Sequence, residues 1–237
     1  ELGSTVLAEG KDVTVQLGVR KFEPQANFWK SNKARSTFPA HVPKTDEVRV
    51  QSEPGLITEL AGLPYYITVK LDGTSATYVM IGTEDDRFHV CSRNMSLKNE
   101  PDSLYWEMAR KYGIAELLDG PLSGLAIQGE ICGPKVQGNK LGLNDPDLYV
   151  FGMWHVTRAA YLGYDELRDL SERHGLTMVP LMETGSDFRY TIDDLLVKAD
   201  GYYAGTHTRR EGIVIRPQNH MTSATRGGGP LSMKAIS

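Results

Sequence analysis

Cysteine is nearly absent from this 237-residue sequence, which contains only Cys91 and Cys132. Two lone cysteines cannot build a disulfide framework, and they are too few for a four-cysteine zinc site. The six histidines show no pair spacing typical of a zinc site either. Both cysteines lie in apolar, strand-like runs, so we expect two buried free thiols and no zinc chemistry.

Long apolar runs and a strong charge of one sign are also missing. No stretch approaches the run of about 18 apolar residues that a membrane helix needs, and no signal-peptide pattern opens the chain. We therefore expect an intracellular protein, cytoplasmic or nuclear, without a membrane partner. The formal net charge of −4 excludes a globally basic nucleic-acid binder, so any nucleic-acid surface would be a local basic patch.

The pattern that is present is one of strands with helices between them. Residues 102–118 have helical spacing that Gly113 interrupts, and Thr191 with Asp194 resembles a capping box that opens a further helix. Strands are predicted at 65–72, 77–81, 88–91, 125–132, 148–154, 213–215 and 231–236, and another helix at 164–174. Strict alternation of strands and helices is absent, which favours an α+β fold with a largely antiparallel core.

The segment Lys70-Leu-Asp-Gly follows the first predicted strand. Because side chains two residues apart point to the same side of a strand, Lys70 and Asp72 would project into one crevice. Gly73 allows a tight turn where a side chain would obstruct. A lysine nucleophile must lose its charge before it attacks, through desolvation or nearby positive charge. Alone, this tetrapeptide is a weak signal, since a surface lysine beside a turn aspartate is common.

Further polar residues stand inside apolar strand runs. Glutamates in such runs are costly unless they are paired or bound to a cation. The segments are Ser92-Arg93-Asn94, Gln128-Gly129-Glu130-Ile131, the aromatic strand from Leu148 to Trp154, the strand from Glu211 to Arg216, and Ser232-Met233-Lys234. Two lysines, an arginine, two acidic strand residues and an aromatic platform together suit a triphosphate, a divalent metal ion and a purine ring.

In this order, the segments resemble the motifs of the covalent nucleotidyltransferases, which include ATP-dependent DNA ligases, RNA ligases and mRNA capping guanylyltransferases. The resemblance runs from Lys70 to Lys234 and so covers most of the chain. It implies an α+β, ATP-grasp-like ligase fold with a largely antiparallel sheet and peripheral helices. We expect this nucleotidyltransferase domain to span residues 19–237, after an N-terminal tail or linker at residues 1–18.

The resemblance also implies a role for each matching residue. The catalytic set would be Lys70, Asp72, Glu130, Glu211 and Lys234. Lys70 would attack the α-phosphorus of ATP, expel pyrophosphate and hold AMP, while Lys234 would stabilise the charge on the α-phosphate. Asp72, Glu130 and Glu211 would be the ligands of a Mg²⁺ or Mn²⁺ ion or of its waters, with a share in holding the ribose.

The same resemblance implies the nucleotide-binding residues. The Val69 backbone would contact the edge of the adenine, and Phe151 would stack on its ring. Arg93 would hold the ribose or the substrate phosphate. The set is completed by Lys70, Glu130 and Lys234. Alternation along residues 148–154 places Tyr149, Phe151 and Met153 on one face and Val150 and Trp154 on the other, and we expect Trp154 in the core.

Within this superfamily the sequence is most similar to RNA ligases. Thr74-Ser75 follows Gly73, where DNA ligases usually carry an arginine at the second position. Residues 129–141 are similar to RNA ligases of the end-joining and nick-sealing type. Residues 38–39 and 43–51 resemble the leader of RNA ligases with an N-terminal OB domain. The resemblance therefore implies an ATP-dependent RNA ligase, monomeric, that joins 3′-OH and 5′-phosphate ends of RNA in nicked duplexes or single strands.

Too little chain precedes Lys70 for an OB barrel, and three residues follow Lys234. We therefore expect strong AMP-adduct formation and weak end joining from this chain. Ser232 departs from the Lys-x-Lys pattern of many relatives, so one phosphate contact would come from elsewhere, such as Lys135, Lys140, Arg209 or Arg210.

Three alternatives stay open. An mRNA capping guanylyltransferase would take GTP, and a DNA ligase fragment would prefer DNA ends. A catalytically silent nucleic-acid-binding module would form no covalent adduct, although such a module has no need for buried carboxylates.

Overall fold

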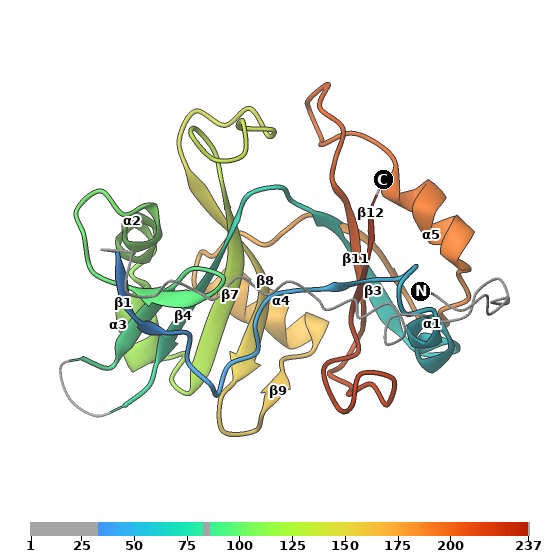
Figure 1. Ribbon diagram of the computed structural model, residues 1–237, viewed down its shortest axis with the longest axis horizontal. Coiled ribbons are helices and arrows are strands. Elements are labelled where there is room, and N and C mark those ends of the chain that lie inside the picture. Colours follow the sequence, from blue (N-terminus) through green and yellow to red (C-terminus); the bar gives the residue numbers. More distant parts are fainter. Residues whose placement is uncertain (1–32, 83–85, 237) are drawn as a thin grey trace, which may run out of the picture. The chain divides into compact units, whose positions relative to one another are not determined.

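Two β-sheets form the framework of the described part of the chain (Figure 1). The computed structural model describes residues 33–82 and 86–236, and the expected tail at residues 1–18 lies outside them. In spatial order, the larger sheet contains β1 (Ala34–Thr37), β6 (Met95–Leu97), β5 (Phe88–Cys91), β4 (Thr74–Met80), β7 (Leu125–Cys132), β8 (Asp147–His155) and β9 (Ala160–Tyr161). The smaller sheet contains β10 (Leu181–Gly185), β3 (Tyr65–Lys70), β11 (Gly212–Pro217), β12 (Met233–Ile236) and β2 (Val48–Arg49).

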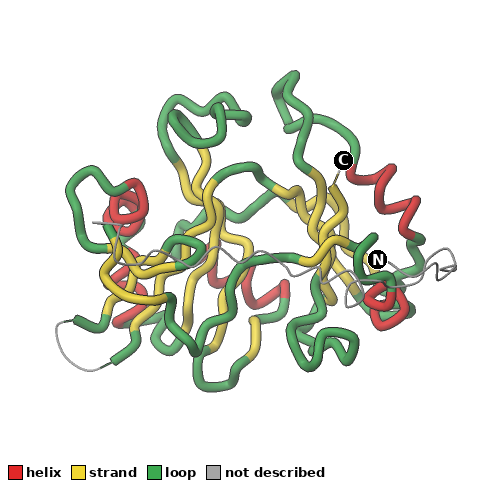
Figure 2. The backbone as a smooth tube through the Cα atoms, viewed as in Figure 1, coloured by secondary structure: helices red, strands yellow, loops and turns green. Residues whose placement is uncertain are grey.

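The strands pair antiparallel except for β12 and β2, which run parallel. Figure 2 shows the strands as two groups joined by loops. The α+β class with a largely antiparallel core is therefore confirmed. The sequence did not predict five short strands and one short helix, which are β1, β2, β6, β9, β10 and α1 (Gly55–Leu60). Each has two to six residues, which are too few to show a periodic pattern.

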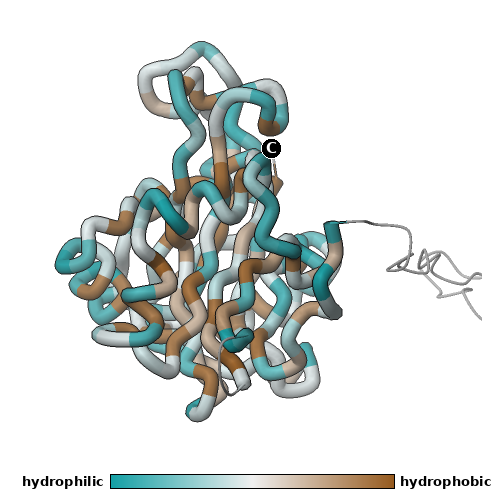
Figure 3. The backbone as a smooth tube through the Cα atoms, turned by 90° about the vertical axis from the view of Figure 1, so that its left-hand side faces the viewer, coloured by the Kyte–Doolittle hydropathy of each residue, from teal (hydrophilic) through white to brown (hydrophobic). Residues whose placement is uncertain are grey.

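Each sheet has its own apolar core, covered by its own helices. Helices α1 (Gly55–Leu60) and α5 (Ile192–Ala199) pack on the smaller sheet, where Leu60 and Leu195 are buried beside Ile213. Helices α2 (Leu104–Lys111), α3 (Ile114–Asp119) and α4 (Tyr164–Arg173) pack on the larger sheet. In Figure 3 apolar residues run through the strands in the middle of the view, and hydrophilic residues are frequent on the loops.

Three local predictions are confirmed, two about helices and one about the cysteines, and one prediction about a strand needs a correction. Gly113 adopts the left-handed conformation, with φ of 56°, and divides residues 102–118 into α2 and α3. Thr191 and Asp194 form the reciprocal capping box at the start of α5. Cys91 and Cys132 are buried free thiols, and burial raises the pKa of each to about 12.

The correction concerns β8. Gln128 pairs with Gly152 and Gly129 pairs with Val150, so Phe151 is the extra residue of a β-bulge. The bulge reverses the alternation after residue 151. Phe151 therefore packs with Tyr149, whereas Met153 is buried with Val150 in the core of the larger sheet. The prediction that Met153 shares a face with Phe151 is wrong, and so is the prediction that Trp154 shares a face with Val150, because Trp154 packs with Val79 and Ala126 in a separate cluster. The prediction that Trp154 is a core residue is confirmed.

The segment Leu71-Asp72-Gly73 carries the chain from one sheet to the other. Strand β3 ends at Lys70 in the smaller sheet, and β4 begins at Thr74 in the larger one. There is no room for a side chain at Gly73, because an added Cβ would lie 2.3 Å from the Ile131 carbonyl oxygen. The Lys-x-Asp-Gly turn therefore lies where both sheets contribute side chains.

Within the part of the chain that the structure describes, no helix is long and apolar enough to cross a membrane.

Candidate active site

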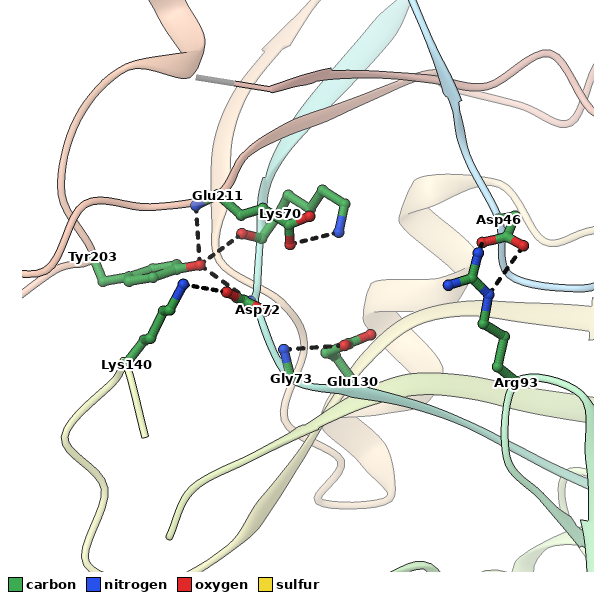
Figure 4. A network of polar contacts seen from close by, with 9 residues as sticks. All are labelled: Asp46, Lys70, Asp72, Gly73, Arg93, Glu130, Lys140, Tyr203 and Glu211. Atoms are coloured by element: carbon green, nitrogen blue, oxygen red, sulfur yellow. Dashed lines mark hydrogen bonds and ion pairs between the residues drawn. The ribbon is translucent and has the colours of Figure 1, made fainter. Parts of the chain in front are cut away.

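Lys70 lies beside Glu211 because of the pairing of two neighbouring strands. Strands β3 and β11 are antiparallel, and Lys70 stands opposite Gly212, the first residue of β11. Glu211 directly precedes that glycine. The Lys70 Nζ donates to Glu211 Oε2 at 2.7 Å, between partly exposed side chains (Figure 4). Two residues 141 positions apart in the sequence therefore form one ion pair at the end of the smaller sheet.

Tyr203 ties the same two strands together at their backbones. Its hydroxyl donates to the Lys70 carbonyl oxygen at 3.1 Å. The Tyr203 hydroxyl oxygen also accepts the backbone N–H of Asp72 and the backbone N–H of Glu211, each at 3.1 Å. Burial raises the pKa of Tyr203 to about 12, so the hydroxyl keeps its proton and its donor role at neutral pH. Sequence reasoning missed this residue, because Tyr203 belongs to a loop without a motif.

Glu130 approaches the turn from the larger sheet. It stands on β7, and its Oε1 accepts the backbone N–H of Gly73 at 3.2 Å. Burial raises the pKa of Glu130 to about 7, and the charge of Lys70 opposes part of this rise. The carboxyl group is therefore held in a site that disfavours its charged form. A buried carboxyl of this kind, beside other titratable groups in a cavity, is typical of a functional site.

Asp72 is paired with a lysine of another loop. The Lys140 Nζ lies 2.5 Å from Asp72 Oδ2, and this contact is visible in Figure 4. Lys140 comes from the loop between β7 and β8. The sequence suggested it as one of four possible phosphate contacts, and the structure brings it to the Lys-x-Asp-Gly turn.

Lys234 completes the predicted catalytic set. It stands on β12 opposite Val214, and it faces the same cavity as Lys70 and Glu211. Burial and then the neighbouring charge of Lys70 lower the pKa of Lys234. Arg93 also lines this cavity, but its guanidinium group forms an exposed ion pair with Asp46 on the side away from Tyr203 (Figure 4). The structure therefore brings together all five predicted catalytic residues, with Arg93 at the edge.

Two adjoining cavities share Lys70 and Glu130. The polar cavity has a volume of about 320 Å³ and is lined by Lys70, Asp72, Glu130, Glu211 and Lys234, together with Arg93 and backbone near Gly73. The narrow cavity has a volume of about 50 Å³ and is lined by apolar side chains, among them those of Val69 and Phe151, and by polar or charged ones, among them that of Arg216. The Val69 N–H donates to the Pro180 carbonyl oxygen at 2.9 Å, so a contact with a base would fall to the Val69 carbonyl.

Arg216 supports the Phe151 side of the narrow cavity. Its guanidinium group donates to the Phe151 carbonyl oxygen at 2.6 Å and to Glu47 Oε1 at 2.6 Å. It also lies over the Phe151 ring, 5.6 Å from its centroid. A further bond goes to Ser232 Oγ at 3.1 Å, on the neighbouring strand. The Glu47–Arg216 ion pair is mostly buried, and the sequence gave no signal for it.

The described residues contain no group of three histidines, cysteines or carboxylates arranged to hold a metal ion by themselves. Asp72 and Glu211 are each neutralised by a lysine, and Glu130 is bonded to backbone. Any ion that these carboxylates help to bind would need oxygen ligands from another source, such as phosphate or water. Mg²⁺ is commonly bound in that way, by one or two carboxylates with substrate phosphates and waters.

The model of the RNA ligase family matches residues 63–236. These residues include β3 with Lys70, Glu130 on β7, and Lys234 on β12. The chain belongs to the RNA ligase family. No curated protein matches the sequence.

This RNA ligase family member is similar in structure to an RNA ligase from Naegleria gruberi. A lysine-to-alanine variant of that ligase with ATP and manganese is 33% identical to this chain, with a TM-score of 0.78. The match covers 96% of this chain and 65% of that one. The form with pyrophosphate gives the same values. A lysine-to-methionine variant with AMP and manganese also has a TM-score of 0.78 and 33% identity, and 66% of its chain is covered. The chain therefore spans just under two thirds of these relatives.

We predict that Tyr203→Phe destabilises the protein by about 1–3 kcal/mol, because the backbone N–H groups of Asp72 and Glu211 lose their acceptor. Urea unfolding monitored by circular dichroism measures this difference. Tyr202→Phe is the matched control, because it removes the same hydroxyl group from the neighbouring residue, which is 56% exposed. Equal stability of the two variants would contradict the role assigned to the Tyr203 hydroxyl.

We predict that Glu130→Gln stabilises the metal-free protein at pH 8 by about 2 kcal/mol. The folded-state pKa of Glu130, about 7, lies above its ordinary value of 4.5. The ionised form therefore costs folding free energy above pH 7, and this cost disappears below about pH 4, where both states are protonated. Unfolding measured across this range should show the advantage of glutamine shrinking as the pH falls. An advantage that does not change with pH would contradict the prediction.

Proposed function

We propose that this chain is the nucleotidyltransferase domain of an ATP-dependent RNA ligase that forms a lysyl-AMP intermediate on Lys70. The observation that carries the proposal is the position of Lys70, at the junction of a narrow cavity that contains Phe151 and a polar cavity rich in charged groups. The Phe151 ring offers a stacking surface for a purine, and the charged groups of the second cavity suit a triphosphate. ATP, AMP and pyrophosphate accompany the similar ligase in its solved structures, which supports the same nucleotide here.

In the first step, Lys70 Nζ forms a bond to the α-phosphorus of ATP. The bond from that phosphorus to the oxygen that bridges to the β-phosphate breaks, and its electron pair leaves with pyrophosphate. The lysine ammonium group carries three protons and the phosphoramidate nitrogen carries one, so two protons leave the nitrogen. The Glu211 carboxylate, 2.7 Å away, accepts the first and passes it to water, and the second goes to water after the N–P bond has formed.

A divalent cation fits the electrostatics of the polar cavity. Five carboxyl groups line it, and four of them form ion pairs: Asp46 with Arg93, Glu47 with Arg216, Asp72 with Lys140 and Glu211 with Lys70. A triphosphate that takes these cations for its own oxygens leaves the carboxylates unbalanced, unless further positive charge enters with it. Asp72, Glu130 and Glu211 would hold Mg²⁺ or Mn²⁺ or its waters. When bound, the ion would orient the phosphates and favour the uncharged form of the attacking amine.

Other residues bind the nucleotide. Phe151 stacks on the adenine, and Arg216 fixes the position of Phe151 through its carbonyl oxygen and its ring. Lys234 stabilises the charge that develops on the α-phosphate. Arg93 holds the ribose or the 5′-phosphate of the substrate. Its exposed ion pair with Asp46 would have to open first, and an exposed pair of this kind contributes little stability.

The remaining steps join polynucleotide ends. An oxygen of the 5′-phosphate of RNA attacks the α-phosphorus of lysyl-AMP, and the N–P bond breaks as the nitrogen of Lys70 takes up a proton. A 3′-OH then attacks the activated 5′-phosphate, loses its proton, forms the phosphodiester bond and releases AMP. Nicked duplexes and single-stranded ends both fit this chemistry.

Several finer assignments belong to the same proposal. These are membership of the group with an N-terminal OB domain, a nucleotidyltransferase domain at residues 19–237, a monomeric state and an intracellular location. The resemblance of residues 38–39 and 43–51 to the leader of that group supports the first of them.

Incubation with ATP and Mg²⁺ or Mn²⁺ should add the mass of one AMP to the protein. Intact-mass spectrometry measures the adduct, and Lys70→Ala should abolish it, because no other side chain has the same position beside the α-phosphorus. Lys135→Ala, on an exposed loop position, is the control that keeps the adduct. An adduct with GTP alone would indicate a capping guanylyltransferase, and no adduct with either nucleotide would indicate a silent binding module.

The AMP-loaded protein should join a nick with RNA on its 3′-OH side faster than the same nick with DNA there, because a 2′-OH is both donor and acceptor for protein groups. Gel separation of labelled strands measures the two rates. Equal or faster joining of the DNA strand would favour the DNA ligase alternative.

A further inference from the structure

Lys140 forms an ion pair with a carboxylate of the Lys-x-Asp-Gly turn. Of the three carboxylates expected to hold a metal ion or its waters, two have a lysine partner, which is Lys70 for Glu211 and Lys140 for Asp72. In Figure 4 Lys140 reaches the Lys-x-Asp-Gly turn from a loop of the larger sheet, on the same side of the site as Tyr203. Lys140 is partly exposed, and its partner Asp72 lines the polar cavity. Lys70 is the expected nucleophile, and the family comparison assigns no role to Lys140.

The loop that carries Lys140 has a defined conformation. The Asn139 side-chain amide spans the turn, since its oxygen accepts the Leu143 N–H at 3.0 Å and its nitrogen donates to the Leu143 carbonyl oxygen at 2.8 Å. Lys135, Gln137 and Asn139 have positive φ angles, as do two glycines between residues 138 and 142. These features fix the backbone on both sides of Lys140 and direct its side chain to Asp72.

Two of the other candidates for the missing phosphate contact have partners away from the Lys-x-Asp-Gly turn, and the third has a more exposed position than Lys140. Arg209 forms an ion pair with Asp200. Arg210 donates to backbone carbonyl oxygens at the end of α5. Lys135 is exposed on the same loop as Lys140. At position 232, where many relatives carry a lysine, the serine hydroxyl accepts a bond from Arg216, which faces the narrow cavity instead.

We propose that Lys140 binds the β- and γ-phosphates of ATP, the part that leaves as pyrophosphate. The inference rests on the proposed function and adds a substrate contact to it. With the nucleoside beside Phe151 and the α-phosphorus at Lys70, the rest of the triphosphate extends into the polar cavity toward Asp72. Lys140 Nζ lies at that carboxylate. A lysine ammonium group is a compact point charge with three donors, which suits phosphate oxygens.

Asp72 has a positioning role toward Lys140 in this arrangement. Before nucleotide binds, the carboxylate holds the ammonium group at the edge of the cavity. When a triphosphate enters, the ammonium group exchanges Asp72 for a phosphate oxygen, and Asp72 becomes available for a cation or its waters.

Nucleotide binding to a Lys70→Ala protein, which cannot form the adduct, tests the contact without catalysis. Isothermal titration with ATP, pyrophosphate and AMP in Mg²⁺ compares this protein with its Lys140→Ala and Lys135→Ala derivatives. We expect Lys140→Ala to weaken binding of ATP and pyrophosphate about tenfold, as for the loss of one charge-assisted hydrogen bond, and to leave AMP unchanged. Lys135→Ala should change none of the three. Equal weakening of ATP and AMP, or no change, would overturn the proposal.

A second comparison separates a phosphate contact from simple neutralisation of Asp72. In an Asp72→Asn, Lys70→Ala protein, Lys140→Ala should still weaken ATP binding relative to AMP. If the effect disappears in that background, Lys140 only neutralises Asp72 and the proposal is wrong. These titrations do not depend on adduct formation. A native Lys70 protein without an AMP adduct would therefore count against the proposed function alone, while the titrations would still decide the role of Lys140.

Discussion

The antiparallel register of β3 and β11 is the constraint on which the site depends. It places Lys70 opposite Gly212 and therefore beside Glu211. Position 212 requires glycine for its contact with the neighbouring strand β12, since φ at Gly212 is 153° and an added Cβ would lie 2.1 Å from the Ala235 carbonyl oxygen. The Tyr203 hydroxyl then bonds to the backbone of both strands. A shift of one residue in this register would turn the nucleophile away from its carboxylate partner.

The electrostatic balance of the site follows from that geometry. Four of the five carboxyl groups around the polar cavity form ion pairs, Asp46 with Arg93, Glu47 with Arg216, Asp72 with Lys140 and Glu211 with Lys70. The fifth, Glu130, is buried, accepts the backbone N–H of Gly73 and has a pKa of about 7. Such an arrangement costs folding free energy that the two apolar cores must offset. Buried and charged groups gathered in this way are poorly suited to stability alone, which is typical of a functional site.

The two sheets contribute different parts of the candidate site. The smaller sheet supplies Lys70, Lys234 and the start of β11. The larger sheet supplies Glu130 and, at a β-bulge, Phe151. Arg216 connects the two, because it stands on β11 and bonds to the Phe151 carbonyl oxygen. The bulge therefore turns one aromatic side chain toward the nucleoside cavity, while its neighbour Met153 stays in the core.

The sequence by itself determined which residues are candidates for the site and most of the long elements. Residue types, strand periodicity and motif order indicated Lys70, Asp72, Glu130, Glu211 and Lys234, and the strand at 125–132 has the predicted bounds. These signals are local, since each depends on neighbours within a few positions. Only the tertiary structure decided the Tyr203 hydroxyl bonds, the Lys140–Asp72 pair and the bulge at Phe151. Each of these depends on the register and spacing of segments distant in the sequence, which local periodicity does not encode.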